Sequence, residues 1–310
     1  MPFIVPADFP EYHDQKEQTN CTEEEFQGLF AHLKPTLFQR IIRMISFIVS
    51  LAWLRLTIFL ILLCIFTIIL LFLAFLQKHF FPKSKLFKTL AFYILTPISR
   101  IAFFFLQFAH VKINGKILPT TRTLIANHLT FFDATLAFSY FRASFLIMAG
   151  AKNSFFMQAL SNLIDFIFVD RSKKEGITTQ MIEIQQNKDL QPLIVFPEGK
   201  ITNGNALIGF RTGAFISDTP IQAICIRYKS WFSNKEWASP SWLDDGIFDY
   251  VYQLLSIPFC TVEFNILPPL NIEGKSPAER AVAYQLQMAN FLGIPAYSKT
   301  NKAIFQKKEE

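Results

Sequence analysis

The strongest constraint on the fold is a run of 21 residues without a charge, from Leu56 to Leu76. At 1.5 Å per residue, a helix of this length extends about 31 Å, the thickness of a bilayer's hydrocarbon core. A buried helix of a soluble protein rarely stays apolar on every face for so long. The run therefore predicts a membrane segment, and a composition that is 51% hydrophobic agrees with this.

The orientation of this segment is not set by its flanking charges, because basic residues occur on both sides of it. They are Lys34, Arg40, Arg43 and Arg55 before the run, and Lys78, Lys83, Lys85 and Lys88 after it. A charged side chain at the bilayer centre costs about 2.5–3.5 kcal/mol on insertion scales, so we expect Arg55 near an interface. Two arrangements satisfy these conditions: a single span that begins near Leu56, or a helical hairpin that enters and leaves on the same side.

A second apolar segment extends from Leu86 to Ala109 and is interrupted by two basic residues and by Pro97. A proline inside a helix removes a hydrogen bond and clashes with the preceding turn, so Pro97 predicts a kink or a break. The segment fits either a pair of interfacial helices or one helix packed against the next domain. We therefore assign residues 44–110 to membrane-embedded or interfacial helices, preceded by a polar N-terminal arm at residues 1–43.

From Val111 onward, short apolar runs alternate with amphipathic segments, which predicts an α/β domain built on one sheet. The expected strands are 124–126, 145–148, 166–169, 193–196, 221–226 and 262–267. The expected helices are 134–141, 155–163, 177–186, 210–216, 247–255 and 277–292. In the last of them, Ser276 and Glu279 form a capping box and Gly293 follows the end. We assign residues 111–296 to this domain and 297–310 to a polar tail.

The charge and cysteine content exclude several classes of function. The net charge is +6, and a basic, hydrophobic chain favours a membrane surface over nucleic acid as its partner. The sequence carries no nucleic-acid-binding signature. The four cysteines (Cys21, Cys64, Cys225 and Cys260) have no paired spacing, which predicts neither a disulfide framework nor a metal site. We expect no metal and no resident cofactor.

One histidine and one aspartate, His128 and Asp133, follow the expected strand 124–126, and no later histidine occurs in the chain. A neutral imidazole can act as a general base, and a carboxylate at the start of the next helix can orient it and stabilise the imidazolium. The chain has no Gly-x-Ser-x-Gly elbow. The pair therefore points to direct deprotonation of a substrate hydroxyl, worth about 10²- to 10⁴-fold. The alternative is a turn in which His128 binds backbone.

Two further polar segments follow expected strands. The first is Phe196-Pro197-Glu198-Gly199-Lys200-Ile-Thr202-Asn203-Gly204, with Arg211 beyond it. An acid, a base and a hydroxyl at a strand end suit a polar headgroup or a phosphate, and the alternative is an ordinary turn. The second is Asp170-Arg171 after strand 166–169. The Arg171 guanidinium offers a bidentate fork for phosphate, and a solvated Asp–Arg pair is the alternative.

Four ordered blocks resemble the glycerolipid acyltransferase family, that of the 1-acylglycerol-3-phosphate acyltransferases. They are Asn127-His128-x-x-x-x-Asp133, Val169-Asp170-Arg171, Phe196-Pro197-Glu198-Gly199 and Pro220-Ile221. Further segments, among them 111–116, 202–204, 226–228 and 262–264, are similar to the branch that acylates lysophosphatidylcholine and lysophosphatidylethanolamine. The resemblance implies an α/β fold with a single mixed sheet flanked by helices, together with N-terminal membrane helices.

The resemblance also implies a reaction and a site. His128, oriented by Asp133, would take the proton from a free hydroxyl of a lysophospholipid, and the alkoxide would attack the thioester of acyl-CoA, the co-substrate. Glu198 and Gly199 would bind the glycerol backbone of the acceptor and Arg171 its phosphate. Asn127, Lys200, Thr202 and Arg211 complete the expected substrate-binding set. The expected location is a membrane, either the endoplasmic reticulum of a eukaryote or the cytoplasmic membrane of a bacterium.

The sequence departs from the family pattern at three positions. Lys200 stands where a threonine is usual, Ile201 where phosphatidate-forming members have an arginine, and Asp165 near the position of a glycine. The missing arginine favours a zwitterionic headgroup. The charge of Lys200 keeps lysophosphatidate and glycerol-3-phosphate as alternative acceptors. A third alternative is a non-catalytic, membrane-anchored lipid-binding protein that keeps the fold.

Overall fold

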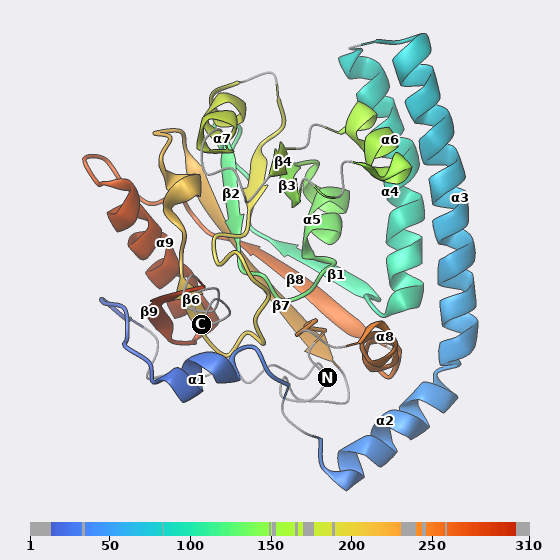
Figure 1. Cartoon of the computed structure of the whole chain (residues 1–310), viewed down its shortest axis with the longest axis horizontal. Helices are drawn as coiled ribbons and strands as arrows, with labels where there is room; N and C mark the ends of the chain where they lie inside the picture. The colour runs from blue at the N-terminus through green and yellow to red at the C-terminus, as the bar shows by residue number, and fades with distance from the viewer. Residues whose placement is uncertain are drawn as a thin grey trace.

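The computed structural model describes residues 14–32, 35–82, 84–148, 150, 153–164, 167–169, 177–187, 190–230, 240–243, 246–257 and 259–301. In this part of the chain a seven-stranded sheet lies at the centre. Helices cover both of its faces, and two long helices stand side by side along one flank (Figure 1).

The central sheet is mixed, as expected. Its strands are β1 His110–Asn114, β2 Thr123–Ala126, β3 Ser144–Met148, β4 Ile167–Val169, β5 Leu193–Val195, β7 Ile221–Ser230 and β8 Cys260–Ile266, in the order β1-β8-β7-β2-β5-β3-β4. Strands β7 and β8 pair antiparallel, and the other neighbours pair parallel. Strand β2 lies between β5 and β7, so its C-terminal end emerges at the middle of the sheet.

The helices of the α/β domain lie close to their expected positions. They are α5 Asp133–Phe141, α6 Phe155–Leu163, α7 Ile177–Gln186, α8 Ile247–Leu255 and α9 Pro277–Leu292. The capping box of Ser276 and Glu279 is present, and Gly293 ends α9 in the left-handed conformation. The expected helix 210–216 is instead a short 3-10 turn, η3 Thr212–Phe215, because it occupies a tight connection between two strands.

Three strands were not expected: β1, β6 Leu207–Gly209 and β9 Ala296–Thr300. Strand β1 is largely exposed, and its His-Val-Lys-Ile-Asn sequence forms no apolar run. Strands β6 and β9 pair with each other in a separate two-stranded sheet. Most of β9 falls in the segment that we expected to be a polar tail. A strand with one open face keeps polar residues such as Ser298 and Lys299, and for this reason the sequence of β9 resembles that of a tail.

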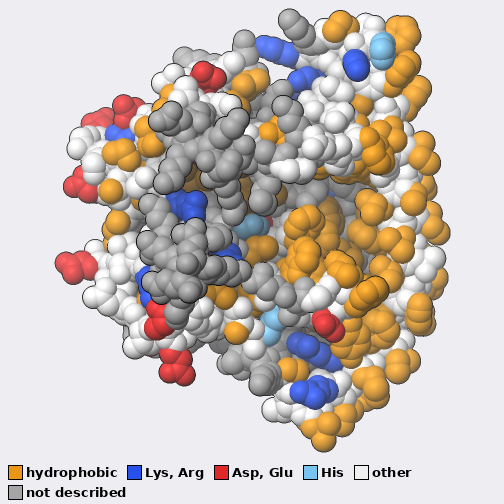
Figure 2. Space-filling view, in the orientation of Figure 1, with side chains coloured by type: hydrophobic (Ala, Val, Ile, Leu, Met, Phe, Trp, Pro, Cys, Tyr) orange, Lys and Arg blue, Asp and Glu red, His pale blue; other side chains and the backbone are white. Residues whose placement is uncertain are grey.

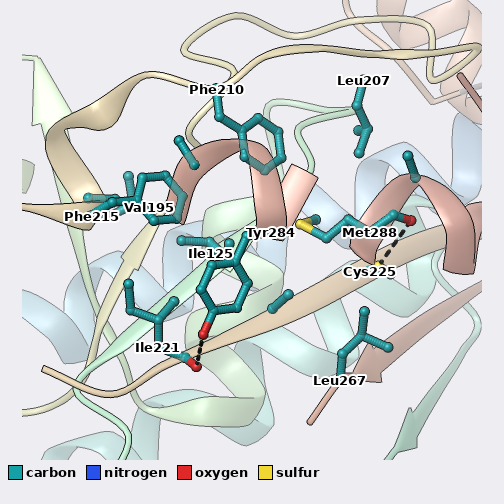
Figure 3. Close-up of a cluster of buried hydrophobic side chains, with 14 of the residues drawn as sticks. Ile125, Val195, Leu207, Phe210, Phe215, Ile221, Cys225, Leu267, Tyr284 and Met288 are labelled. Atoms are coloured by element: carbon teal, nitrogen blue, oxygen red, sulfur yellow. Dashed lines mark hydrogen bonds between the residues drawn. The ribbon is translucent and has the colours of Figure 1, made fainter. Parts of the chain in front are cut away.

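The side chains of the sheet divide alternately between two cores, as a strand's period of two requires. Ile125 of β2 packs with Tyr284 and Met288 of α9 on one face (Figure 3). Leu124 and Ala126 pack on the other face, against α5 and α8. The Tyr284 hydroxyl also donates to the backbone oxygen of its neighbour across the core, Ile221, at 2.8 Å. Strand β2 is therefore held from both sides.

Four helices precede the sheet: α1 Glu23–Gly28, α2 Leu37–Val49, α3 Ala52–His79 and α4 Lys85–Leu106. Helices α1 and α2 each begin with a capping box. Helix α1 lies in the segment that we assigned to a polar arm, yet its Phe26 is fully buried against Ala206 and Ile208. Helix α2 crosses the boundary that we placed at residue 43.

Helices α3 and α4 pack side by side as a helical hairpin, and each is long and apolar enough to cross a membrane. Pro97 does not break the helix, and α4 continues past it to Leu106. Ala91 and Leu95, just before the proline, pack against α3 and α6, and this contact holds the helix together. The Arg55 guanidinium donates to the backbone oxygens of Phe105 and Leu106 at the end of α4, where the helix dipole favours a positive charge.

Candidate active site

The site begins where β2 ends, and Asn127 fastens that end to the neighbouring strand. Its Nδ2 donates to the backbone oxygen of Ile226 at 3.0 Å, and its Oδ1 accepts the N–H of Ile226 at 2.7 Å. The side chain thus continues the β2–β7 ladder by one residue. Asn127 is 2% exposed, so the structure places it beneath the site, in a supporting position.

His128 and Asp133 meet as the sequence predicts. Nδ1 of His128 lies 2.9 Å from Oδ2 of Asp133. The same Oδ2 accepts the backbone N–H groups of Leu129 and Thr130 at 2.6 and 2.8 Å, so the loop between the two residues folds around the carboxylate. Asp133 is fully buried at the first position of α5, where the helix dipole favours its negative charge. With Nδ1 held by the Asp133 carboxylate, Nε2 is the ring nitrogen left for another partner.

Tyr228 is a site residue that the sequence did not identify as one. Its hydroxyl donates to Oδ1 of Asp133 at 2.5 Å, from the buried strand β7. Burial and the adjacent carboxylate hold the pKa of Tyr228 well above its ordinary value, so the hydroxyl stays protonated. Tyr228 comes from a strand 95 residues away along the chain, and no local pattern indicates that contact.

The imidazole of His128 is packed on one face and partly open. It stacks on Phe196, which follows β5, with 4.3 Å between ring centroids. One-fifth of the His128 side chain remains exposed. The backbone oxygen of His128 accepts the N–H of Thr202 at 3.1 Å. The segment from Phe196 to Gly204 thus fixes the ring and the backbone of His128, while the ring stays reachable from solvent.

Glu198 lies under the His128 loop. It is fully buried, and its Oε1 accepts the backbone N–H of His128 at 3.0 Å. Burial raises the pKa of Glu198 to about 8, against the opposing effect of that N–H. The carboxyl is therefore largely protonated near neutral pH. The structure thus places the Glu198 carboxyl beneath His128, in contact with its backbone.

Gly199 makes a turn that only glycine fits well. Its φ is +67°, and a Cβ there would lie 2.7 Å from Nδ2 of Asn301. Asn301, directly after β9, is fully buried and donates to the backbone oxygen of Glu198 at 2.8 Å. Its Oδ1 accepts from Nε and Nη2 of Arg211 at 2.9 and 2.7 Å. Asn301 was not expected in the site, because its segment was taken for a polar tail.

Lys200 and Thr202 lie in the segment that follows Gly199, and two other residues of interest fall outside the described part of the chain. The Lys200 ammonium sits 4.7 Å from the ring centroid of Phe30, which follows α1. Thr202 is buried, and its hydroxyl accepts the N–H of Gly204 at 3.3 Å. Arg171 and Asp165 fall outside the described residues. Among those described, no group of three or more His, Cys, Asp or Glu side chains could hold a metal.

Comparison with known proteins confirms the predicted resemblance. Residues 111–227, which contain the His128, Asp133 and Glu198 blocks, match a family model described as Acyltransferase. The chain is 30% identical over 211 residues to lysophosphatidylcholine acyltransferase 1 of Danio rerio, covering 65% of this chain and 40% of that protein. It is 27% identical over 219 residues to lysophospholipid acyltransferase LPCAT4 of Xenopus tropicalis, covering 67% and 41%. The chain thus spans about 40% of the length of these relatives.

A solved structure with the same fold is the crystal structure of the 1-acyl-sn-glycerophosphate (LPA) acyltransferase PlsC from Thermotoga maritima. The TM-score is 0.52 at 16% sequence identity, and the match covers 83% of this chain and 98% of that one. At this identity the match establishes the fold, including the mixed sheet flanked by helices.

Proposed function

We propose that this chain, whose residues 111–227 match the family model described as Acyltransferase, is a membrane-bound enzyme that moves a fatty acyl group from acyl-CoA to a free hydroxyl of a lysophospholipid. The observation that carries the proposal is the His128–Asp133 pair. Nδ1 of His128 is held by the Asp133 carboxylate, which two backbone N–H groups anchor in turn, and the His128 ring is partly exposed. This is the arrangement that a general base requires.

The reaction follows from that arrangement. Nε2 of His128 takes the proton of the acceptor hydroxyl, and Asp133 stabilises the imidazolium that forms. The alkoxide oxygen attacks the thioester carbonyl carbon, a C–O bond forms, and the C–S bond breaks as the tetrahedral intermediate collapses. The thiolate of CoA leaves and takes the proton back from His128. No acyl group is attached to the protein at any stage, so the base is restored in each cycle.

The acceptor we favour is lysophosphatidylcholine or lysophosphatidylethanolamine. Two relatives bear the names lysophosphatidylcholine acyltransferase and lysophospholipid acyltransferase. Ile201 supports this, because it puts an uncharged side chain where phosphatidate-forming members have an arginine. Lys200 lies over the ring of Phe30, and its charge near the turn keeps lysophosphatidate and glycerol-3-phosphate as the second candidates.

A cavity offers a place for the acyl chain. Its volume is about 350 Å³, and it lies between α4, α5, α6 and the start of β3. Its apolar wall includes Phe92, Leu95, Phe138 and Leu160, and basic side chains (Lys85, Lys88 and Arg142) line it as well. We assign the acyl chain of the donor to this cavity, because its apolar side chains from α4, α5 and α6 offer a hydrocarbon chain room away from water.

Acyl transfer can be tested with the full chain reconstituted in phosphatidylcholine vesicles. Release of free CoA from acyl-CoA is measured with lysophosphatidylcholine, lysophosphatidylethanolamine, lysophosphatidate and glycerol-3-phosphate as acceptors. We expect the two zwitterionic lipids to be the best acceptors, and His128→Ala and Asp133→Asn to abolish release. A wild-type chain that acylates none of the four, or a His128→Ala variant with full activity, would refute the proposal and leave the lipid-binding alternative.

A further inference from the structure

We propose that α2 and α8 form a second membrane-facing surface, which lies flat on the lipid leaflet and brings the His128 loop to the acceptor. This inference rests on the proposed function. It concerns a different part of the molecule from the α3–α4 hairpin. The surface consists of the exposed apolar side chains of α2 and α8 together with Phe131.

Helix α2 presents a complete apolar face to solvent. Its large exposed side chains are Leu37, Phe38, Ile41, Met44, Ile45, Ile48 and Val49, with Leu37 and Phe38 at 75% and 70% exposure. Most of these positions recur at intervals of three or four residues, so they share one side of the helix. Within the described chain, none of the 13 residues of α2 is buried. A helix patterned in this way requires an apolar partner that the folded monomer does not provide.

Helix α8 extends this face toward the active site. It contacts α2 through Phe47 and Tyr252, whose ring centroids are 5.2 Å apart. Ser46 donates to the backbone oxygen of Ser256 at 2.7 Å. On its open side α8 exposes Ile247 and Phe248, the latter at 88%. The two helices are thus in contact, and each exposes large apolar side chains.

Aromatic contacts connect α8 to the loop that carries the base. Tyr250 of α8 stacks on Trp242 with centroids 5.1 Å apart, and Trp242 meets Phe131 edge-on at 5.7 Å. Phe131 lies three residues after His128 and is 58% exposed. Through Trp242 and the buried Tyr250, the exposed Phe131 is therefore packed against α8.

The length and position of α2 select a lipid leaflet as the partner. A 13-residue helix is about 20 Å long, too short to span a bilayer and suited to lying in its interface. Leu51, with φ +52°, turns the chain between α2 and α3, so α2 leaves the hairpin at an angle (Figure 1). Leu51, Trp53 and Leu54 are each more than half exposed at the junction, and a tryptophan there fits the membrane interface.

The apolar surface is also continuous with the hairpin. Figure 2 shows hydrophobic side chains along the flank formed by α3 and α4 and down to the end where α2 lies. If the hairpin enters the bilayer, α2 meets the leaflet surface at its base. A lysophospholipid in that leaflet can then present its hydroxyl to His128 while its acyl chain stays in the membrane.

The test compares an acceptor that resides in the membrane with one that does not. Ile45→Glu on α2 and Phe248→Glu on α8 place a charge in the proposed interface. In vesicles, long-chain lysophosphatidylcholine is the membrane acceptor. In detergent, a short-chain lysophosphatidylcholine below its micellar concentration is the free acceptor. We expect each variant to lose about tenfold or more of its rate in vesicles, since one buried charge opposes interfacial binding, and to keep its rate with the free acceptor.

Two further variants serve as controls. Ile216→Glu changes a comparably apolar, 37% exposed residue that follows η3, which packs on α9, and should leave both rates unchanged. Phe248→Trp keeps an interfacial aromatic and should retain the vesicle rate. Equal losses with both acceptors, or no loss with either, would overturn the inference. A wild-type dimer that the glutamate variants split would make this surface a subunit interface instead. A wild type inactive with every acceptor would refute the proposed function itself.

Discussion

Tyr228 and Asp133 form the deepest contact of the site: the phenol donates to Oδ1 while Oδ2 is taken by His128 and by two backbone N–H groups. Every hydrogen bond to the carboxylate therefore comes from a donor that favours its ionised form. In the proposed mechanism, Tyr228 of β7 therefore acts on His128 only through Asp133, because it does not touch the imidazole.

The first prediction concerns Tyr228→Phe. Removing the hydroxyl leaves one lone pair of a buried carboxylate without its donor, at a cost of about 1–3 kcal/mol. We expect kcat to fall about tenfold while KM changes little, because the imidazolium formed during proton transfer loses part of its stabilisation. Steady-state kinetics with the best acceptor measure both constants. The pH dependence of kcat should also shift, since Tyr228 acts through the Asp133–His128 pair.

Tyr284→Phe is the matched control for this variant. Tyr284 is also a buried tyrosine whose hydroxyl has a single backbone acceptor, Ile221, on the other face of the sheet. Loss of the Tyr284 hydroxyl should lower thermal stability by about as much as Tyr228→Phe does, while kcat stays near the wild-type value. Equal kcat values for Tyr228→Phe and the wild type would show that the contact is structural only.

The second prediction follows from the raised pKa of Glu198. The ordinary pKa of this carboxyl is 4.5, and its pKa in the fold is about 8. Between these two pH values the folded chain therefore holds a proton that the unfolded chain has released. The stability contributed by this group is complete below about pH 4.5 and is lost as the pH rises to about 8. Glu198→Gln keeps the shape and lacks this titration. Chemical unfolding across pH 5 to 8.5 should therefore show the wild type losing stability relative to Glu198→Gln.

Glu198→Gln also tests what the carboxyl does in the reaction. Since the group is largely protonated near neutral pH, the amide should still accept the N–H of His128 through its oxygen. We expect acyl transfer at pH 7 within a few-fold of the wild type, on the order of 1 kcal/mol or less in the barrier. Glu198→Ala removes the acceptor and should lose far more. Complete inactivity of a folded Glu198→Gln protein would favour direct contact with the substrate.

The third prediction concerns Asn301, which holds both the turn at Glu198 and the guanidinium of Arg211. Asn301→Ala should destabilise the fold by about 1–3 kcal/mol, because the buried backbone oxygen of Glu198 loses its donor. Arg211→Ala removes the other partner. The double variant should cost less than the two single costs added together, since both remove one shared interaction. Strict additivity in denaturant unfolding would show that the two contacts are independent.

The sequence predicts the parts of the site that are encoded locally. Asp133 begins a helix five residues after His128, so their contact depends on one turn, and the limits of α9 follow from its own caps. Tyr228 and Asn301 reach the site only through the pairing of β7 with β2 and of β9 with β6. Strand β9 exposes polar residues on one side, and its sequence therefore resembles a tail. Pro97 left open whether the second apolar segment forms one helix or two, and the packing of α4 on α3 and α6 accompanies the single helix.

The fourth prediction concerns the cavity along α5. Leu160 of α6 lines it together with Phe138 and Leu95, so a tryptophan at residue 160 reduces the room available to a ligand. If the donor's acyl chain occupies the cavity, Leu160→Trp should move the preference for acyl-CoA toward shorter chains, because a long chain no longer fits without displacing packed side chains. Leu160→Met, which nearly conserves volume, should keep the wild-type preference. Initial rates with a series of saturated acyl-CoA donors measure the preference. An unchanged profile in an active Leu160→Trp enzyme would place the acyl chain elsewhere, and the cavity would then have a different occupant.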